Sequence, residues 1–185
     1  MTALTPANQL TLLRMFLIPA FVILVVYGHL GWALIVFVTA GVTDALDGVI
    51  ARRSDQKTNL GAWLDPMADK LLLVTTFVVL TLPGLGLENR LPIWLTVLII
   101  FRDVGIVLTV AIVNLAVGPR TFRPSMLGKA ATAIYILTAV AAIFFNYLGY
   151  RSRIFDLFIY ASLVITLASG LDYIWHAARL IDTTS

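Results

Sequence analysis

Long apolar runs alternate with short polar segments along most of the chain. Each run has close to the roughly 20 residues that a helix needs to cross the hydrocarbon core of a bilayer. The polar segments between the runs are too short for a further domain, so consecutive helices should run antiparallel. The pattern predicts about six membrane-spanning helices, at roughly residues 9–27, 31–53, 61–82, 91–117, 128–147 and 153–178.

The composition supports this class of protein and argues against several others. Hydrophobic residues make up 60% of the 185 residues, charged residues make up 12%, and the mean hydropathy is +0.95. Such a chain is expected to be an all-α integral membrane protein, folded as one domain over residues 1–185. The absence of cysteine excludes disulfides and thiolate metal sites. The net charge of +3 is too small for a nucleic-acid-binding domain, so no nucleic-acid partner is expected.

The cationic residues are unevenly divided between the two sides of the predicted bundle. Because cytoplasmic loops carry the excess of Lys and Arg, both termini and the loop at 54–60 should face the cytoplasm. The chain has no Arg- and Ser-rich leader, which favours a bacterial inner membrane over an imported mitochondrial protein. Nine cationic residues fall near one side (Arg14, Arg52, Arg53, Lys57, Lys70, Arg120, Arg123, Lys129 and Arg179) and three near the other (Arg90, Arg151 and Arg153).

Four aspartates interrupt this apolar pattern on both sides of the loop at 54–60. Asp44 and Asp47 are three residues apart on the second predicted helix, and Asp65 and Asp69 are four apart on the third. Both spacings place two side chains on one helix face. Asp44 precedes Arg52 by eight residues and Asp69 follows Gly61 by eight, so both should lie about 12 Å deep. Two antiparallel helices would then present their carboxylates at matching depths.

Four carboxylates this close would repel one another unless they took up protons or bound cations. Oxygen ligands without His or Cys favour Mg²⁺, Mn²⁺ or Ca²⁺. Two divalent ions would neutralise all four charges, and paired ions suit phosphoryl chemistry. Taken singly, each aspartate could instead be half of a structural ion pair.

Small residues and one arginine surround the aspartates. Gly48, Ala51 and Gly61 would leave backbone surface that a bulky ligand can approach, and Arg52 offers a planar fork suited to a phosphate. The glycines could equally serve close helix packing. An apolar chain has little other reason to gather these residue types around four carboxylates.

These residues spell D-x2-D-G-x2-A-R-x8-G-x3-D-x3-D between Asp44 and Asp69. The stretch resembles the signature of the CDP-alcohol phosphatidyltransferase family, with every position matched in type and spacing. The resemblance covers a specific motif of eight fixed positions over 26 residues, and the six predicted helices agree with it in outline.

The resemblance implies a membrane-embedded enzyme, usually homodimeric, that uses Mg²⁺ or Mn²⁺. It transfers a phosphatidyl group from CDP-diacylglycerol to an alcohol and releases CMP. By position, Asp69 would be the general base on the acceptor hydroxyl. Two metal ions would be held by Asp44, Asp47, Asp65 and Asp69. The CDP moiety would be bound by Asp44, Gly48, Ala51, Arg52 and Gly61.

The acceptor has to be inferred from residues outside the signature. An arginine as deep as Arg102 should face a polar cavity or a partner, and the adjacent Asp103 points about 100° away around the helix, which makes it a poor direct partner. Together with Arg120 and Lys129, Arg102 suits an anionic acceptor. Positive-inside anchoring is the alternative explanation for the loop cations.

Glycerol 3-phosphate, as in the phosphatidylglycerophosphate synthase branch, is the first candidate acceptor. The N-x2-T-x2-R stretch at Asn8–Arg14 resembles that branch and could shape the nucleotide end of the pocket, although Arg14 could equally be an interfacial anchor. The P-S-x2-G-K-x2-T stretch from Pro124 to Thr132 resembles the cardiolipin synthase branch, whose acceptor is phosphatidylglycerol. An inositol phosphate acceptor is less favoured.

Two further expectations concern the rest of the chain. Asp172, His176 and Arg179, at spacings of four and three residues, share one face of the last predicted helix and should form a small polar cluster with a packing role. The main non-enzyme alternative is a cation-coupled transporter, because carboxylates within the membrane also mark ion paths. Carriers usually place such groups near the midplane on broken helices, which these runs do not suggest.

Overall fold

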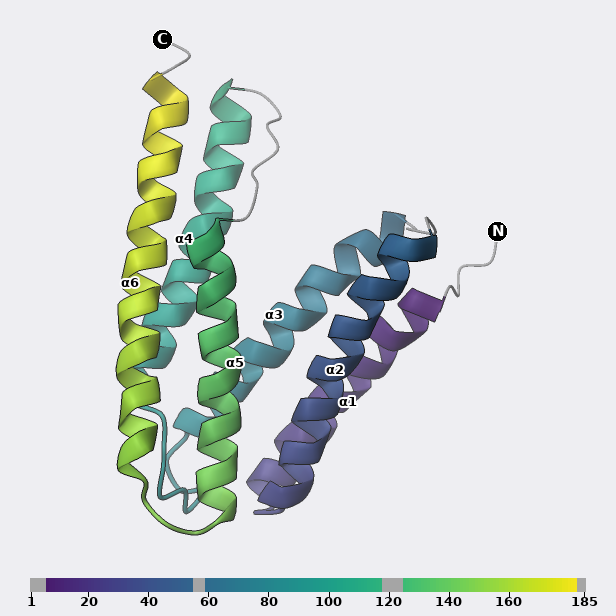
Figure 1. Cartoon of the computed structure of the whole chain (residues 1–185), viewed down its shortest axis with the longest axis vertical. Helices are drawn as coiled ribbons and strands as arrows, with labels where there is room; N and C mark the ends of the chain where they lie inside the picture. Colours follow the sequence, from purple (N-terminus) through teal and green to yellow (C-terminus); the bar gives the residue numbers. More distant parts are fainter. Residues whose placement is uncertain (1–5, 55–58, 118–124, 183–185) are drawn as a thin grey trace. The chain divides into compact units, whose positions relative to one another are not determined.

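The computed structural model of the chain describes residues 6–54, 59–117 and 125–182, and side chains within 12–43, 70–109 and 125–176 together with Ala68 and Leu115. All regular secondary structure in these ranges is α-helical, as predicted, and the boundaries lie within a few residues of those expected (Figure 1). The helices are α1 (Pro6–Val26), α2 (Leu30–Ser54), α3 (Asn59–Thr81), α4 (Ile93–Val117), α5 (Met126–Tyr147) and α6 (Arg153–Asp182).

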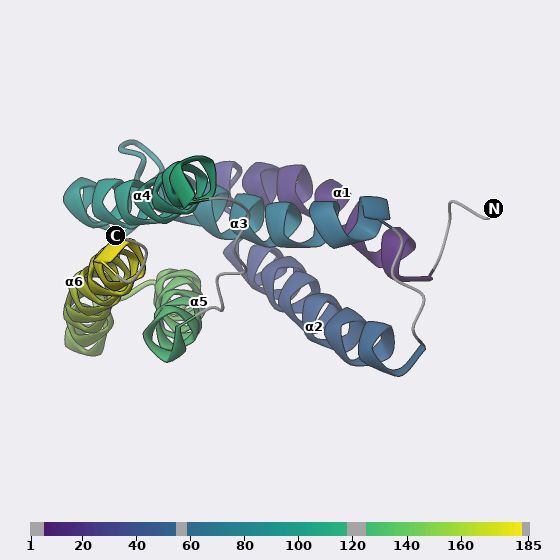
Figure 2. The same cartoon turned by 90° about the horizontal axis from the view of Figure 1, so that it is seen from above.

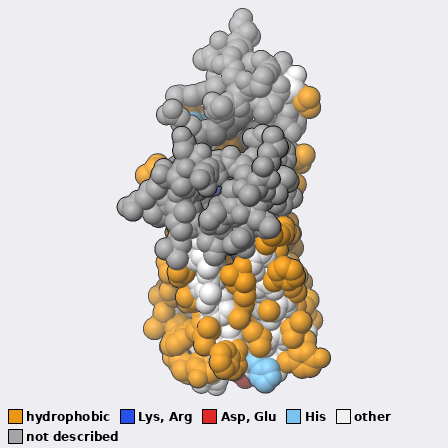
Figure 3. Space-filling view, turned by 90° about the vertical axis from the view of Figure 1, so that its right-hand side faces the viewer, with side chains coloured by type: hydrophobic (Ala, Val, Ile, Leu, Met, Phe, Trp, Pro, Cys, Tyr) orange, Lys and Arg blue, Asp and Glu red, His pale blue; other side chains and the backbone are white. Residues whose placement is uncertain are grey.

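Two described stretches are long and apolar enough to cross a membrane by length and composition, namely Met126–Tyr147 and Arg153–His176. Shorter apolar stretches occur in α1, α2 and α3, at Leu12–Val26, Leu30–Thr43 and Lys70–Thr81. The described surface in Figure 3 is mostly hydrophobic. These features agree with a membrane protein, and the full set of six spans stays a prediction.

The chain packs as two compact units. Unit 1 contains α1, α2, α3 and the part of α5 from Ala139, and unit 2 contains α4, the part of α5 up to Thr138, and α6. In unit 1, α1 packs against both α2 and α3 (Figure 2). The buried faces of α1 and α2 meet at Phe21 and Phe37, whose ring centroids lie 5.8 Å apart.

A pair of buried asparagines ties the segment after α3 to α5 within unit 1. The backbone N–H of Asn89 donates to Oδ1 of Asn146 at 2.8 Å, and Nδ2 of Asn146 donates to the Asn89 carbonyl at 3.1 Å. Nδ2 of Asn89 also donates to the carbonyl of Tyr150 at 2.8 Å. Amides that are buried must find partners, so these bonds fix the segment in place.

In unit 2, α4 packs against α6, and hydroxyl groups join α5 to α6. The hydroxyls of Tyr135 and Thr166 lie 2.6 Å apart, and those of Thr138 and Ser162 lie 2.8 Å apart. Side-chain hydrogen bonds of this kind hold helices together in lipid, where apolar contact alone gives little preference for a partner helix.

The turn between α1 and α2 depends on a glycine. Gly28 has φ of +77°, a left-handed conformation that a side chain disfavours. Its N–H donates to the carbonyl of Val25 at 3.0 Å, which ends α1 and reverses the chain within three residues. Gly149 has the same role between α5 and α6, with φ of +70°.

Candidate active site

The signature residues lie on the two helices for which they were predicted. Asp44, Asp47, Gly48, Ala51 and Arg52 are in the second half of α2, and Gly61, Asp65 and Asp69 are near the start of α3. The backbone is helical at each of these positions, which confirms the helical spacing on which the face argument rests. Their side chains lie outside the described residues, so the convergence of the four carboxylates stays a prediction.

The register of α2 connects the first two aspartates to the core of unit 1. Ala33, Phe37 and Ala40 are buried, and they form one stripe at spacings of four and three residues. Asp44 and Asp47 continue the same spacing, four and seven residues beyond Ala40. This spacing extends the prediction that the two aspartates share one helix face, and their side chains lie outside the described residues.

The helical register of α3 likewise relates its aspartates to buried residues, which here follow Asp65 in the sequence instead of preceding it. Thr76, Leu72 and Ala68 are buried at intervals of four residues, and the hydroxyl of Thr76 donates to the carbonyl of Leu72 at 2.8 Å. Asp65 lies three residues before Ala68 and continues this stripe, whereas Asp69 lies one position around the helix. The two helices that carry the four aspartates both pack on α1.

Arg14 supplies a buried positive charge in the same unit. It lies on α1 and is 1% exposed, on one stripe with the buried residues Phe21 and Val25. An arginine that anchored the helix at the membrane surface would be exposed, so that alternative explanation of Arg14 is wrong. Its Nε and Nη2 atoms are enclosed by protein, and a buried guanidinium is stable only with anionic or polar groups around it.

Arg102 on α4 is the best-defined charged side chain of unit 2. Its Nε donates to Oγ of Ser169 at 3.1 Å and its Nη1 to Oδ1 of Asp103 at 2.8 Å. The side chains of Arg102 and Asp103 are 11% and 18% exposed. The expectation that Asp103 is a poor direct partner is therefore wrong. The long arginine side chain reaches both Ser169 on α6 and the adjacent Asp103, which an argument from Cα directions alone does not capture.

The two other predicted acceptor-binding residues lie at the start of α5. Lys129 is exposed in the second turn, so its ammonium group is accessible. Ser125 caps this helix, because its hydroxyl accepts a hydrogen bond from the N–H of Gly128 at 3.0 Å. Arg120 lies outside the described residues.

The Asp172–His176 part of the predicted polar cluster on α6 is confirmed, and the side chain of Arg179 lies outside the described residues. Nδ1 of His176 lies 3.3 Å from Oδ1 of Asp172 and 2.8 Å from the carbonyl of the same residue. Trp175 packs edge-on against the His176 ring, with centroids 5.3 Å apart. The exposed imidazole and its local partners agree with a packing role rather than with a ligand site.

No group of three or more His, Cys, Asp or Glu residues able to hold a metal lies within the described side chains. The four signature aspartates are outside that set. Their chemistry nevertheless fits divalent cations, because carboxylates on one pair of helices provide only hard oxygen donors. Asp44, Asp47, Asp65 and Asp69 are thus the residues that could hold metal ions.

Comparisons with known proteins agree with the signature. The model of the family "CDP-alcohol phosphatidyltransferase" matches residues 4–169. A Mycobacterium tuberculosis protein named "Probable phosphatidylglycerophosphate synthase" is 32% identical over 181 residues, which cover 94% of this chain and 81% of that protein. A Streptomyces coelicolor "Cardiolipin synthase (CMP-forming)" is 37% identical over 135 residues, or 70% of this chain and 60% of the relative. The human protein of the same name is 31% identical over 191 residues, or 95% and 62%.

Proposed function

The chain belongs to the CDP-alcohol phosphatidyltransferase family and is an enzyme of that family, and from this premise we propose that it transfers the phosphatidyl group of CDP-diacylglycerol to glycerol 3-phosphate. The products would be phosphatidylglycerophosphate and CMP. The observation that carries the choice of acceptor is the similarity to a protein named as a phosphatidylglycerophosphate synthase, 81% of whose length is matched, against 59–62% for relatives named as cardiolipin synthases. Family membership also favours an enzyme over the cation-coupled transporter.

The reaction is assigned to the signature residues of α2 and α3. Asp69 takes the proton of the acceptor hydroxyl as its oxygen attacks phosphorus, and the bond to CMP breaks on the opposite side. Gly48, Ala51 and Gly61 leave room for the nucleotide, and Arg52 holds its diphosphate. Two Mg²⁺ or Mn²⁺ ions, held by Asp44, Asp47, Asp65 and Asp69, would stabilise negative charge on the phosphate oxygens.

Arg14 is assigned to the same site as a positioning residue. It is buried in α1, which packs on both helices that carry the aspartates. A fixed guanidinium in that place would offset part of the repulsion among four carboxylates before cations bind. This account also explains why so apolar a helix holds a fully buried arginine.

The acceptor's phosphate is assigned to Arg102, Arg120 and Lys129. Support comes from the described members of this set. Arg102 is held in one orientation by Ser169 and Asp103, and Lys129 is accessible. A preorganised guanidinium fork binds phosphate with little loss of side-chain entropy.

Phosphatidylglycerol is the second candidate acceptor, which would make the enzyme a cardiolipin synthase. Relatives of that name are 31–38% identical, although the matched part covers only 59–62% of their length. The apolar groove beside Arg102, described below, also suits an acceptor that carries acyl chains. An inositol phosphate has no comparable observation in its favour.

We place the enzyme in a bacterial inner membrane with six spans, with both termini and the signature facing the cytoplasm. The distribution of Lys and Arg and the six helices support this placement. CMP could then leave into the cytoplasm while the lipid tails stay in the bilayer. A homodimer is proposed from the family resemblance alone.

Release of CMP by the purified protein tests these assignments. The protein in detergent is given CDP-diacylglycerol and Mg²⁺ or Mn²⁺, with glycerol 3-phosphate, phosphatidylglycerol or myo-inositol 1-phosphate in separate reactions. CMP release with glycerol 3-phosphate alone is the expected result. Release with phosphatidylglycerol alone would replace it by the cardiolipin synthase assignment.

A further inference from the structure

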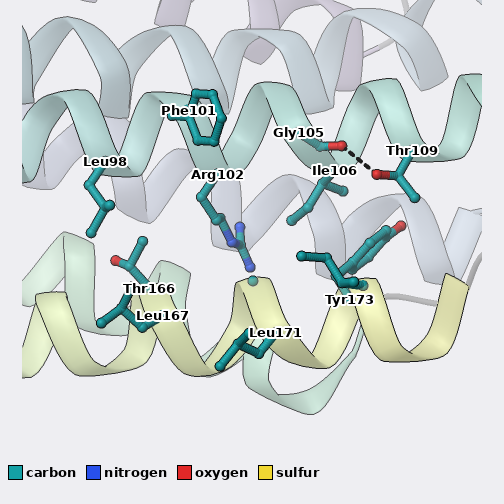
Figure 4. Close-up of a pocket in the computed structure, with 12 residues that line it drawn as sticks. Leu98, Phe101, Arg102, Gly105, Ile106, Thr109, Thr166, Leu167, Leu171 and Tyr173 are labelled. Carbon is teal, nitrogen blue, oxygen red and sulfur yellow. Dashed lines mark hydrogen bonds between the residues drawn. The ribbon is translucent and has the colours of Figure 1, made fainter. Parts of the chain in front are cut away.

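A groove with a volume of about 310 Å³ lies between α4 and α6 in unit 2. Its walls are mostly apolar, and Figure 4 shows Leu98, Phe101 and Ile106 on α4 and Leu167 and Leu171 on α6. Arg102 reaches from α4 into the space between the two helices. The groove thus combines a long apolar lining with one cation.

The groove exists because two of its lining residues lack side chains. Gly105 on α4 and Gly170 on α6 both contribute to its wall. A Cβ at Gly105 would meet no atom within 4 Å, so this glycine does not serve close helix packing. Gly31 on α2 is the contrasting case, because a Cβ there would lie only 2.9 Å from Cε2 of Tyr147. Small residues usually bring helices into contact in membranes, whereas Gly105 leaves an open volume.

The rim of the groove is accessible from the side. Phe101 is 75% exposed and Leu171 is 68% exposed, and Ile174 and Leu167 are also more than half exposed. In a helix that crosses a bilayer, exposed side chains of this kind contact lipid rather than water. An open apolar volume in that position is therefore available to acyl chains.

The guanidinium of Arg102 would favour lipids that carry a phosphate group. Its two hydrogen bonds, to Ser169 and Asp103, use two of the five N–H donors of a guanidinium. A Cβ atom at Gly128 on α5 would lie 3.5 Å from Nη2 of Arg102. Because glycine has no side chain, Gly128 does not cover this side of the guanidinium. A phosphate is the part of a phospholipid that matches a fixed arginine fork.

We propose that the groove between α4 and α6 binds one acyl chain of an anionic phospholipid whose phosphate is held by Arg102. The site lies outside the signature residues. It shares Arg102 with the acceptor site assigned above, and in that respect it rests on the proposed function. The rest of the lipid would extend toward the start of α5, where Lys129 is exposed.

Photolabelling tests the proposal without requiring turnover. The full chain is placed in phosphatidylcholine nanodiscs with phosphatidylglycerol that carries a diazirine on one acyl chain, and labelled peptides are mapped by mass spectrometry. Labelling should concentrate on residues 98–109 and 166–174. Labelling spread evenly over all lipid-facing helices would overturn the proposal, and this measurement needs no variant.

Gly105→Leu then fills the groove, and Val104→Phe is the matched control. Gly105 has open space for a side chain, whereas Val104 is the next residue, is half exposed and does not line the groove. Gly105→Leu should lower the labelling about tenfold, because the added side chain occupies volume that the acyl chain would otherwise fill. Val104→Phe should leave it unchanged. Equal labelling of the two variants would overturn the proposal.

Diacylglycerol with the same diazirine chain tests the role of the phosphate. It should label residues 98–109 much more weakly than the phosphatidylglycerol probe, and Arg102→Gln should remove the difference. Equal labelling by both lipids in the unmodified protein would overturn the assignment of the phosphate to Arg102. CMP release with CDP-diacylglycerol and glycerol 3-phosphate is measured on the same protein preparations. A failure of the proposed reaction and a failure of the lipid site are therefore recorded separately.

Discussion

Arg102 is expected to have a structural role that can be separated from its role toward the acceptor. Its side chain is 11% exposed and bonds to Ser169 on α6 and to Asp103 on its own helix. Arg102→Gln removes the positive charge and leaves the Asp103 carboxylate, which is 18% exposed, without this cation. Arg102→Gln/Asp103→Asn removes both charges and keeps groups that can hydrogen-bond.

The magnitude follows from the burial of the pair. Removing one partner of a buried ion pair costs about 3–5 kcal/mol of stability. Asp103 keeps some solvent contact and takes part in a further interaction, so we expect Arg102→Gln to cost about 2 kcal/mol. The double variant should recover to within about 1 kcal/mol of the unmodified protein, because replacing both charges avoids the unpaired carboxylate.

Acceptor binding should not recover with stability. A hydrogen bond from a charged donor to phosphate contributes about 1.5–3 kcal/mol, so both variants should raise the KM for glycerol 3-phosphate about tenfold to a hundredfold. The KM for CDP-diacylglycerol should change little. CMP release gives the two KM values, and intrinsic tryptophan fluorescence during heating in detergent gives the stability.

Arg153→Gln is the control for the loss of one positive charge, because Arg153 is exposed at the start of α6. Arg153→Gln should change neither the KM for glycerol 3-phosphate nor the thermal stability. Recovery of the acceptor KM in Arg102→Gln/Asp103→Asn would refute the binding role of Arg102 and leave it a purely structural residue.

Three other changes test single features of the structure. Asp69→Asn should lower CMP release by about 10²- to 10⁴-fold without lowering the unfolding temperature, as a lost general base requires, whereas Asp156→Asn on α6 should retain activity. Asn146→Ala should cost about 2–3 kcal/mol in thermal unfolding, because it leaves the buried N–H of Asn89 without its acceptor. Gly28→Ala should cost about 1–2 kcal/mol through its positive φ, and Gly41→Ala, with open space around its Cβ, should not.

The helices could be predicted closely because their signals are local. Apolar runs bounded by Gly, Pro and charged residues place α4 at Ile93–Val117 and α5 at Met126–Tyr147, each within about two residues of the expected range. The larger difference is in α6, which continues to Asp182. The four residues beyond the predicted end are Arg179, Leu180, Ile181 and Asp182. The charged residues among them end the apolar run, although the helix itself continues.

Contacts between side chains could not be predicted in the same way. The sequence indicates that Arg102 needs a partner, yet Ser169 is 67 residues away in the chain and nothing in the local pattern connects the two. The pairing with Asp103 was missed because directions at Cα ignore the reach of a long side chain. The burial of Arg14 likewise depends on how α1 packs against α2 and α3, which is a tertiary property.

Arg14, which is buried, and Arg102, which is partly buried, lie in different units and suggest that the reaction and the choice of acceptor depend on different parts of the chain. Arg14 is in unit 1 with α2 and α3, to which the proposed function assigns the metal ions and the diphosphate of the donor. Arg102 is in unit 2, beside a groove that Gly105 and Gly170 help to line. On the proposed assignment, a change of acceptor requires new contacts around α4 and α6, while the signature residues stay unchanged. Substitutions at Gly105 or Gly170 should alter the relative use of glycerol 3-phosphate and phosphatidylglycerol more than they alter turnover with the preferred acceptor. Equal losses with both acceptors would argue against this division.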